Sequence, residues 1–246
     1  MGVLSDAFND MTESIKEKEF MRTTFGKIVD PNVRDYLLKG NVALGGETRN
    51  VTIMFCDIRN FTAMSESMSP EKVVSLLNKY FTEMEKCISK NHGIINKYIG
   101  DAVMGIFGAP VRSENHALDA FNAAMEMRAA LESLNKKLEG SDFPQIAFGI
   151  GLHSGDVLAG NIGAENRIEY TVIGDTVNTA SRIESLCKSY QKDLLMSEST
   201  CQLILDSVIN ENSTGQNDFV FVDEADIRGK TEKVKLFTKD FNLLKV

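Results

Sequence analysis

The order of strand and helix patterns in the middle of the chain constrains its fold more than any other feature. Apolar periodicity, helix caps and turn residues divide this region into a strand over 51–55, a helix from Ser69 to Gly93, two short strands turning at Gly100-Asp101, a helix over 113–138 and a strand over 146–153. Strand, helix, hairpin, helix, strand is the order of a ferredoxin-like βαββαβ core. We therefore predict an α+β fold whose antiparallel sheet carries helices on one face. A further strand over 168–173 and a helix over 175–190 predict a smaller C-terminal α/β part.

An N-terminal helical extension is predicted ahead of this core. Residues 2–24 lack proline and repeat apolar residues every three or four positions, as an amphipathic helix does, and Asp30-Pro31 begins a second, short helix. We place the domain boundary near residue 47, which separates an extension over 1–47 from a domain over 48–246. The apolar stripe of the first helix consists of Leu4, Phe8, Met11 and Ile15. Its partner is open between the chain's own domain and a parallel two-helix coil in a dimer.

The composition excludes several classes of protein. With 27 Lys and Arg against 35 Asp and Glu, the net charge is −8, and no basic run marks a surface for nucleic acid or anionic lipid. No stretch of the sequence is long and apolar enough to span a membrane, and the start does not resemble a signal peptide. The four cysteines are widely spaced, without a metal-binding pattern. We expect the chain as given to be soluble and cytoplasmic.

Two acidic residues stand where the topology brings strand ends together. Asp57 follows the first predicted strand, and Asp101 lies at the tip of the hairpin. In a βαββαβ sheet these strands are neighbours, so the two carboxylates can converge. Two acids held together repel unless a cation is bound, and hard oxygen ligands suit Mg²⁺ or Mn²⁺. A simple turn-capping role explains the same residues, because Gly-Asp is also a common turn pair.

Two other groups could bind a nucleotide. The chain enters a helix directly after Ile58, so free backbone N–H groups near Phe61 and Thr62 are candidates for binding phosphates. Asn178 and Arg182 are four residues apart on the helix over 175–190 and therefore share one side of it. Such a pair can hold phosphoryl charge and orient a sugar, although a solvated polar face has the same spacing.

Four segments together resemble a known family, the catalytic domain of class III nucleotidyl cyclases. They are FCDIRNFT over 55–62, NKYIGDAVMGIFGAP over 96–110, FGIGLHSGDVLAGNIG over 148–163 and EYTVIGDTVNTASRIE over 169–184. The resemblance runs in order from residue 48 to about residue 240. It implies that Asp57 and Asp101, with the backbone of Ile58, bind two divalent ions. It also implies that Asn178 and Arg182 stabilise the transition state.

The residues that read the base in this family match Lys97 and Thr171. A lysine ammonium can donate to N1 of adenine, and a threonine hydroxyl can accept from its N6 amino group. Guanine presents a donor at N1, so an ammonium there would oppose two donors. The pair therefore favours ATP, although the hydroxyl of Thr171 alone would serve either base.

The chain departs from the family pattern at two places. Asn60 stands where the family commonly has glycine, so the turn needs either an altered backbone or a left-handed asparagine. The family's triphosphate-binding Lys-Gly matches Arg228-Gly229, which keeps the charge but changes its geometry, and Lys230 is the alternative.

The resemblance implies an adenylate cyclase that converts ATP to 3′,5′-cyclic AMP and pyrophosphate with two Mg²⁺ or Mn²⁺ ions per site. In this family each site lies between two catalytic domains, which predicts a homodimer with two shared sites. The N-terminal segment resembles the output helix of a HAMP-type relay followed by a cyclase-connecting element. We therefore expect the cytoplasmic part of a membrane receptor whose transmembrane region precedes this sequence.

Three alternatives accompany this interpretation: a guanylate cyclase, a diguanylate cyclase and an inactive dimerisation or nucleotide-binding module. The second is disfavoured because YIGDAV occupies the hairpin where diguanylate cyclases carry a Gly-Gly-Asp/Glu-Glu-Phe motif.

Overall fold

The computed structural model describes residues 2–40, 43–164, 166–210, 219–230 and 232–239. It divides into two compact units, residues 1–43 and 44–246. Among the described residues, no helix is long and apolar enough to cross a bilayer.

The first unit is helical, as its apolar spacing predicts. It consists of α1 (Gly2–Ile28) and α2 (Pro31–Leu38). Asp30 caps α2, because its side chain accepts a 2.9 Å hydrogen bond from the backbone N–H of Asn32. The predicted stripe on α1 is exposed at Phe8, Met11 and Ile15, and the side chain of Leu4 lies outside those described. A coil partner for this stripe stays a prediction.

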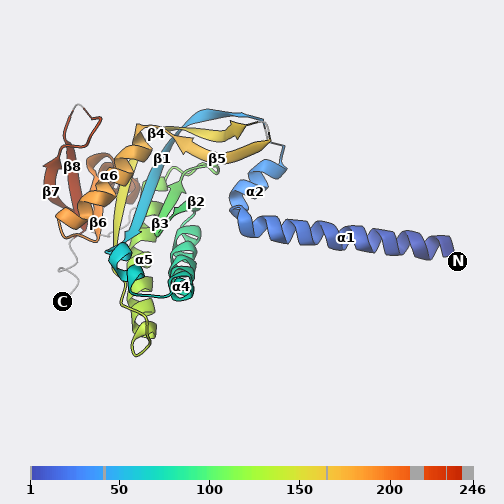
Figure 1. Cartoon of the computed structure of the whole chain (residues 1–246). Coiled ribbons are helices and arrows are strands. Elements are labelled where there is room, and N and C mark those ends of the chain that lie inside the picture. The colour runs from blue at the N-terminus through green and yellow to red at the C-terminus, as the bar shows by residue number, and fades with distance from the viewer. Residues whose placement is uncertain (1, 41–42, 165, 211–218, 231, 240–246) are drawn as a thin grey trace. The chain divides into compact units, whose positions relative to one another are not determined.

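The second unit contains the expected core and C-terminal part. Its elements are β1 (Gly45–Ile58), α3 (Phe61–Glu66), α4 (Pro70–Lys90), β2 (Ile94–Ile99), β3 (Ala102–Phe107), α5 (His116–Leu138), β4 (Phe148–Ala164), β5 (Arg167–Ile173), α6 (Asp175–Ser189), β6 (Leu194–Ser197), α7 (Glu198–Asn210), β7 (Phe219–Ala225) and β8 (Val234–Lys239). Within the described residues, eight strands form one sheet in the order β2-β3-β1-β4-β6-β8-β7, with β5 paired to β4 (Figure 1). Antiparallel pairing of β2 with β3, β3 with β1, and β1 with β4 confirms the ferredoxin-like core.

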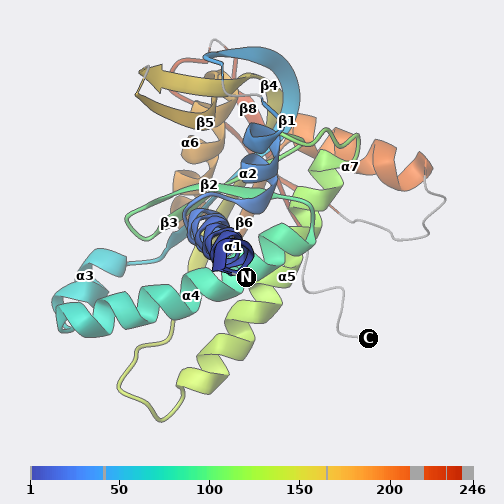
Figure 2. The ribbon, with the colours of Figure 1, turned by 90° about the vertical axis from the view of Figure 1, so that its right-hand side faces the viewer.

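Helices cover both faces of the sheet (Figures 1 and 2). The core helices α4 and α5 share one face, as predicted, where Met54 and Cys56 of β1 pack with Tyr80 of α4 and Met127 of α5. The C-terminal part supplies α6, which covers the opposite face against β4. It lies close to the strand because Gly151 has no side chain there; a Cβ on Gly151 would lie 2.7 Å from the carbonyl oxygen of Ala180 in α6.

Two strands are longer than their sequence patterns predict. β1 begins at Gly45 rather than residue 51, and β4 continues past residue 153 to Ala164. The added halves pair with each other, from Gly45 opposite Asn161 to Asn50 opposite Asp156. These halves contain several glycines and exposed polar residues, which weaken the alternation on which strand prediction depends. Together with β5 they form a long three-stranded extension of the sheet.

Gly151→Ala is expected to destabilise the protein by about 2 kcal/mol, because its methyl group would collide with the backbone of α6. Gly105→Ala on β3 is the matched control, since a Cβ there makes an ordinary 3.5 Å contact with Cβ of Met54. The free energy of unfolding in urea measures both. Equal losses in the two variants would contradict the close packing of α6.

Candidate active site

Asp57 and Asp101 converge at one end of the sheet. Asp57 is the penultimate residue of β1, and Asp101 immediately precedes β3. Cys56 of β1 pairs with Val103 of β3 in antiparallel orientation. Asp57 lies one residue beyond this pair and Asp101 two residues beyond it, so both lie at the same end of the two strands. They lie close enough for a hydrogen bond between the carboxyl groups. The backbone N–H of Ile58 also donates to Asp101.

The electrostatics of this pair favour a cation. Burial raises the pKa of Asp101 from its ordinary 3.8 to about 7. The hydrogen bond with Asp57 and the repulsion between the two carboxylates add to this rise. The Oδ1 atom of Asp57 is buried without a hydrogen-bond partner. A divalent ion would satisfy this oxygen and remove the repulsion between the carboxylates. Among the described residues, no cluster of three or more acidic, histidine or cysteine side chains converges. Further ligands would therefore come from backbone carbonyls, water or phosphates, as is usual for Mg²⁺.

A second charged pair joins the end of β1 to α6. Arg59 places Nη1 3.3 Å from Oε1 of Glu184, which is only 7% exposed. Burial, followed by repulsion from Asp57, raises the pKa of Glu184 to about 7, and the guanidinium of Arg59 opposes this rise. The guanidinium occupies the space where Gly149 lacks a side chain. Arg59 and Glu184 thus border the two aspartates, and sequence reasoning missed both.

The turn after β1 adopts a left-handed conformation at Asn60, which is one of the two alternatives expected from the sequence. Asn60 has φ of 56° and ψ of 29°, and it precedes α3, whose first two residues are Phe61 and Thr62. The left-handed backbone costs little for asparagine. This outcome explains how the chain keeps a tight turn beside Asp57 without glycine.

Asn178 and Arg182 lie on the side of α6 that faces away from the sheet. The buried side of α6 contains Ala180, Ile183 and Glu184, whereas Asn178 is exposed and Arg182 is half-buried. At 100° per residue, Asn178 and Arg182 lie about 120–160° around the helix from Glu184. Within one chain, Glu184 therefore faces Asp57 and Asp101, whereas Asn178 and Arg182 lie on the other side of α6.

The predicted triphosphate-binding turn packs against α6. Gly229 has φ of 88°, and a Cβ placed on it would lie 3.3 Å from Nη1 of Arg182. Nζ of Lys230 lies 2.5 Å from Oδ2 of Asp175 at the start of α6. Arg228 is exposed. The structure thus brings the turn over 228–230 next to Arg182.

Lys97 and Thr171 both lie where β2 meets β5. Nζ of Lys97 is 2.7 Å from Oε1 of Glu169, and the hydroxyl of Thr171 donates a 3.1 Å hydrogen bond to Oδ1 of Asn96. A bulge between Ile95 and Lys97 explains why consecutive residues of β2 both reach β5. Sequence reasoning missed Asn96 and Glu169, because a bulge in β2 and its contact with a distant strand leave no local signal. Glu184, by contrast, is visible in the sequence as a local signal, because it interrupts the apolar side of α6.

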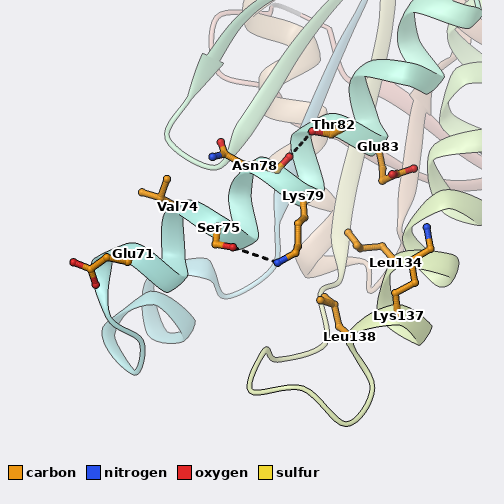
Figure 3. A pocket seen from close by; sticks show the side chains of 10 residues that line it. All are labelled: Glu71, Val74, Ser75, Asn78, Lys79, Thr82, Glu83, Leu134, Lys137 and Leu138. Atoms are coloured by element: carbon orange, nitrogen blue, oxygen red, sulfur yellow. Dashed lines mark hydrogen bonds between the residues drawn. The ribbon is translucent and has the colours of Figure 1, made fainter.

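A groove of about 670 Å³ lies elsewhere, along α4 and α5 (Figure 3). It is lined by Glu71, Val74, Ser75, Asn78, Lys79, Thr82, Glu83, Leu134, Lys137 and Leu138. None of the predicted site residues lines this groove.

The contribution of Asp101 to metal-free stability is expected to be lost as the pH rises from about 4 to about 7. Folded Asp101 holds its proton to a higher pH than the unfolded chain does, so losing that proton costs the folded state stability. Asp101→Asn should remove this contribution from the pH profile and raise the melting temperature in EDTA at pH 8. Mn²⁺ should stabilise the original chain and not this variant. Asp142→Asn, at a surface carboxylate, is the control. A pH profile unchanged by Asp101→Asn would contradict the paired site.

Comparison with known proteins assigns the family. A model of the adenylate and guanylate cyclase catalytic domain matches residues 45–239. An adenylate cyclase of Anabaena cylindrica is 38% identical over 202 residues, which cover 80% of this chain and 38% of that protein. The crystal structure of the adenylyl cyclase CyaB from P. aeruginosa has 30% identity and a TM-score of 0.71, covering 80% of this chain and 96% of that one. The guanylyl cyclase Cya2 has 31% identity and a TM-score of 0.67, covering 79% and 93%.

The relatives are longer than this chain, which covers between 34% and 38% of the length of curated proteins it matches. The match to the family model nevertheless extends over β1 to β8 and includes every candidate site residue. Structures of both adenylyl and guanylyl cyclases share the fold. The chain belongs to the family of adenylate and guanylate cyclase catalytic domains.

Proposed function

We propose that this chain is an adenylate cyclase that converts ATP to 3′,5′-cyclic AMP and pyrophosphate as a homodimer with two shared sites. The observation that carries this proposal is the separation of two half-sites within one chain. Asp57 and Asp101 converge on the face of the sheet that α6 covers, while Asn178 and Arg182 project from the other side of that helix. A nucleotide bound to the Asn–Arg pair of one protomer would meet the aspartates of a second.

Asp57 and Asp101, with the carbonyl of Ile58, would hold two Mg²⁺ or Mn²⁺ ions. When bound, these ions would lower the pKa of the ribose 3′-hydroxyl and neutralise the departing pyrophosphate. The buried, unpartnered Oδ1 of Asp57 and the raised pKa of Asp101 support this assignment.

The remaining residues would position the nucleotide for in-line attack. The 3′-oxygen forms a bond to the α-phosphorus, the bond to the bridging oxygen breaks, and the hydroxyl proton passes to solvent. Arg182 would offset charge on the α-phosphate while Asn178 orients the ribose. Arg228 would hold the terminal phosphates, and backbone groups near Phe61 and Thr62 would contact the phosphate chain.

Lys97 and Thr171 would select the base. An ammonium donates to N1 of adenine and opposes the N1 donor of guanine. Glu169 favours a second candidate, a guanylate cyclase, because its carboxylate lies 2.7 Å from Lys97 and could accept from guanine. The ion pair with Lys97 occupies that carboxylate, so we favour ATP.

The wider setting follows from the N-terminal unit. We infer that α1 and α2 belong to a relay that links a membrane sensor to the catalytic domain on the cytoplasmic side. The exposed stripe of Phe8, Met11 and Ile15 supports a helix pair between protomers. The greater length of the curated relatives leaves room for such a sensor.

The proposal is tested by incubating the purified chain with Mn²⁺ and either ATP or GTP and identifying products by mass spectrometry. We expect cyclic AMP from ATP and little cyclic GMP from GTP. Asp57→Ala should remove the product, while Asp142→Ala, on the surface, should keep it. Cyclic GMP as the main product would reverse the base assignment. No product from a verified dimer would identify an inactive module.

A further inference from the structure

The amide of Asn96 has only one orientation that satisfies its neighbours. Its Nδ2 lies 2.9 Å from the backbone carbonyl oxygen of Tyr170. A carbonyl oxygen can only accept, so the NH₂ group of Asn96 must face Tyr170. Oδ1 of Asn96 therefore faces Thr171, whose hydroxyl oxygen lies 3.1 Å away.

This orientation fixes the direction of the hydrogen bond at Thr171. Oδ1 of Asn96 carries no proton, so the single hydroxyl proton of Thr171 must point toward it. The lone pairs of the hydroxyl remain for a ligand. In isolation a threonine hydroxyl can donate or accept, but beside Asn96 it can only accept.

We propose that Asn96 is a specificity-determining positioning residue, which makes Thr171 an obligate acceptor and so favours adenine over guanine. The N6 amino group of adenine donates a proton, whereas O6 of guanine would place two acceptors opposite each other. This inference rests on the proposed adenylate cyclase function and adds a residue that acts on the base through Thr171.

The local structure gives Asn96 little freedom to take another arrangement. Tyr170 is buried, Asn96 and Thr171 are half-buried, and the bulge in β2 directs Asn96 toward β5. The neighbouring Lys97 is held by Glu169, two residues before Thr171 on the same strand. Both base-reading side chains are thus positioned by residues that span β2 and β5.

The test compares kcat/KM for ATP and GTP in two variants that lose the same contact to Tyr170. Asn96→Ala also removes the acceptor for Thr171, so its hydroxyl can turn and donate to guanine. We expect the ratio of kcat/KM for ATP to that for GTP to fall about tenfold, because guanine would gain about one hydrogen bond that it cannot make in the original chain. Asn96→Asp keeps an acceptor toward Thr171 and should retain a ratio close to that of the original chain. Melting temperatures of both variants report their folding.

A third comparison isolates the route through Thr171. On a Thr171→Val background, Asn96→Ala should leave the ATP:GTP ratio unchanged, because no hydroxyl remains to be oriented. Equal loss of preference in Asn96→Ala and Asn96→Asp would overturn the proposal, since only a structural role would remain. An unchanged ATP:GTP ratio in Asn96→Ala would also overturn the role of Asn96. If the original chain still prefers ATP, the proposed adenylate cyclase function would stand. An original chain that prefers GTP would overturn both this inference and the proposed function.

Discussion

β1 and β4 pair along the whole of β1, from Gly45 opposite Asn161 to Ile58 opposite Phe148. This ladder positions each part of the candidate site. At one end lies Asp57, beside Asp101, which immediately precedes β3. At the other end β4 turns into β5, which carries Thr171 to the bulge of β2. The glycines of β4 let α6 lie against the sheet between these ends.

The proposed division of the site between protomers follows from how α6 packs. Its sheet-facing side includes Glu184, whose charge interacts with Asp57 and Asp101 of the same chain. Its outward side presents Asn178 and Arg182, next to the turn that contains Gly229. A rigid helix cannot direct both sides at one nucleotide. The arrangement fits a two-fold dimer in which each protomer supplies metal-binding acids to one site and base- and phosphate-binding residues to the other.

Local signals were sufficient to predict the core of the fold and the convergence of its acids. The Ser69-Pro70 helix start, the hairpin at Gly100-Asp101 and the apolar strand before Asp57 each depend on neighbouring residues, and their order selects one topology. The left-handed Asn60 was one of two expected outcomes. Strand ends rich in glycine were missed, because β4 owes its extension to pairing with β1 rather than to its own propensity. Asn96 and Glu169 were missed because their roles arise from a contact between β2 and β5 that no sequence spacing reveals. The roles assigned to the site residues stay predictions.

The shared site is tested most directly by mixing two inactive variants. Asp57→Ala lacks one of the acids proposed to bind metal, and Arg182→Ala lacks the arginine proposed to bind the α-phosphate. A heterodimer of the two contains one site with both defects and one site with neither. Random exchange of protomers should therefore restore about one quarter of the original cyclase activity, since half of the dimers are mixed and each has one intact site. A verified heterodimer with no activity would contradict a site built from two protomers.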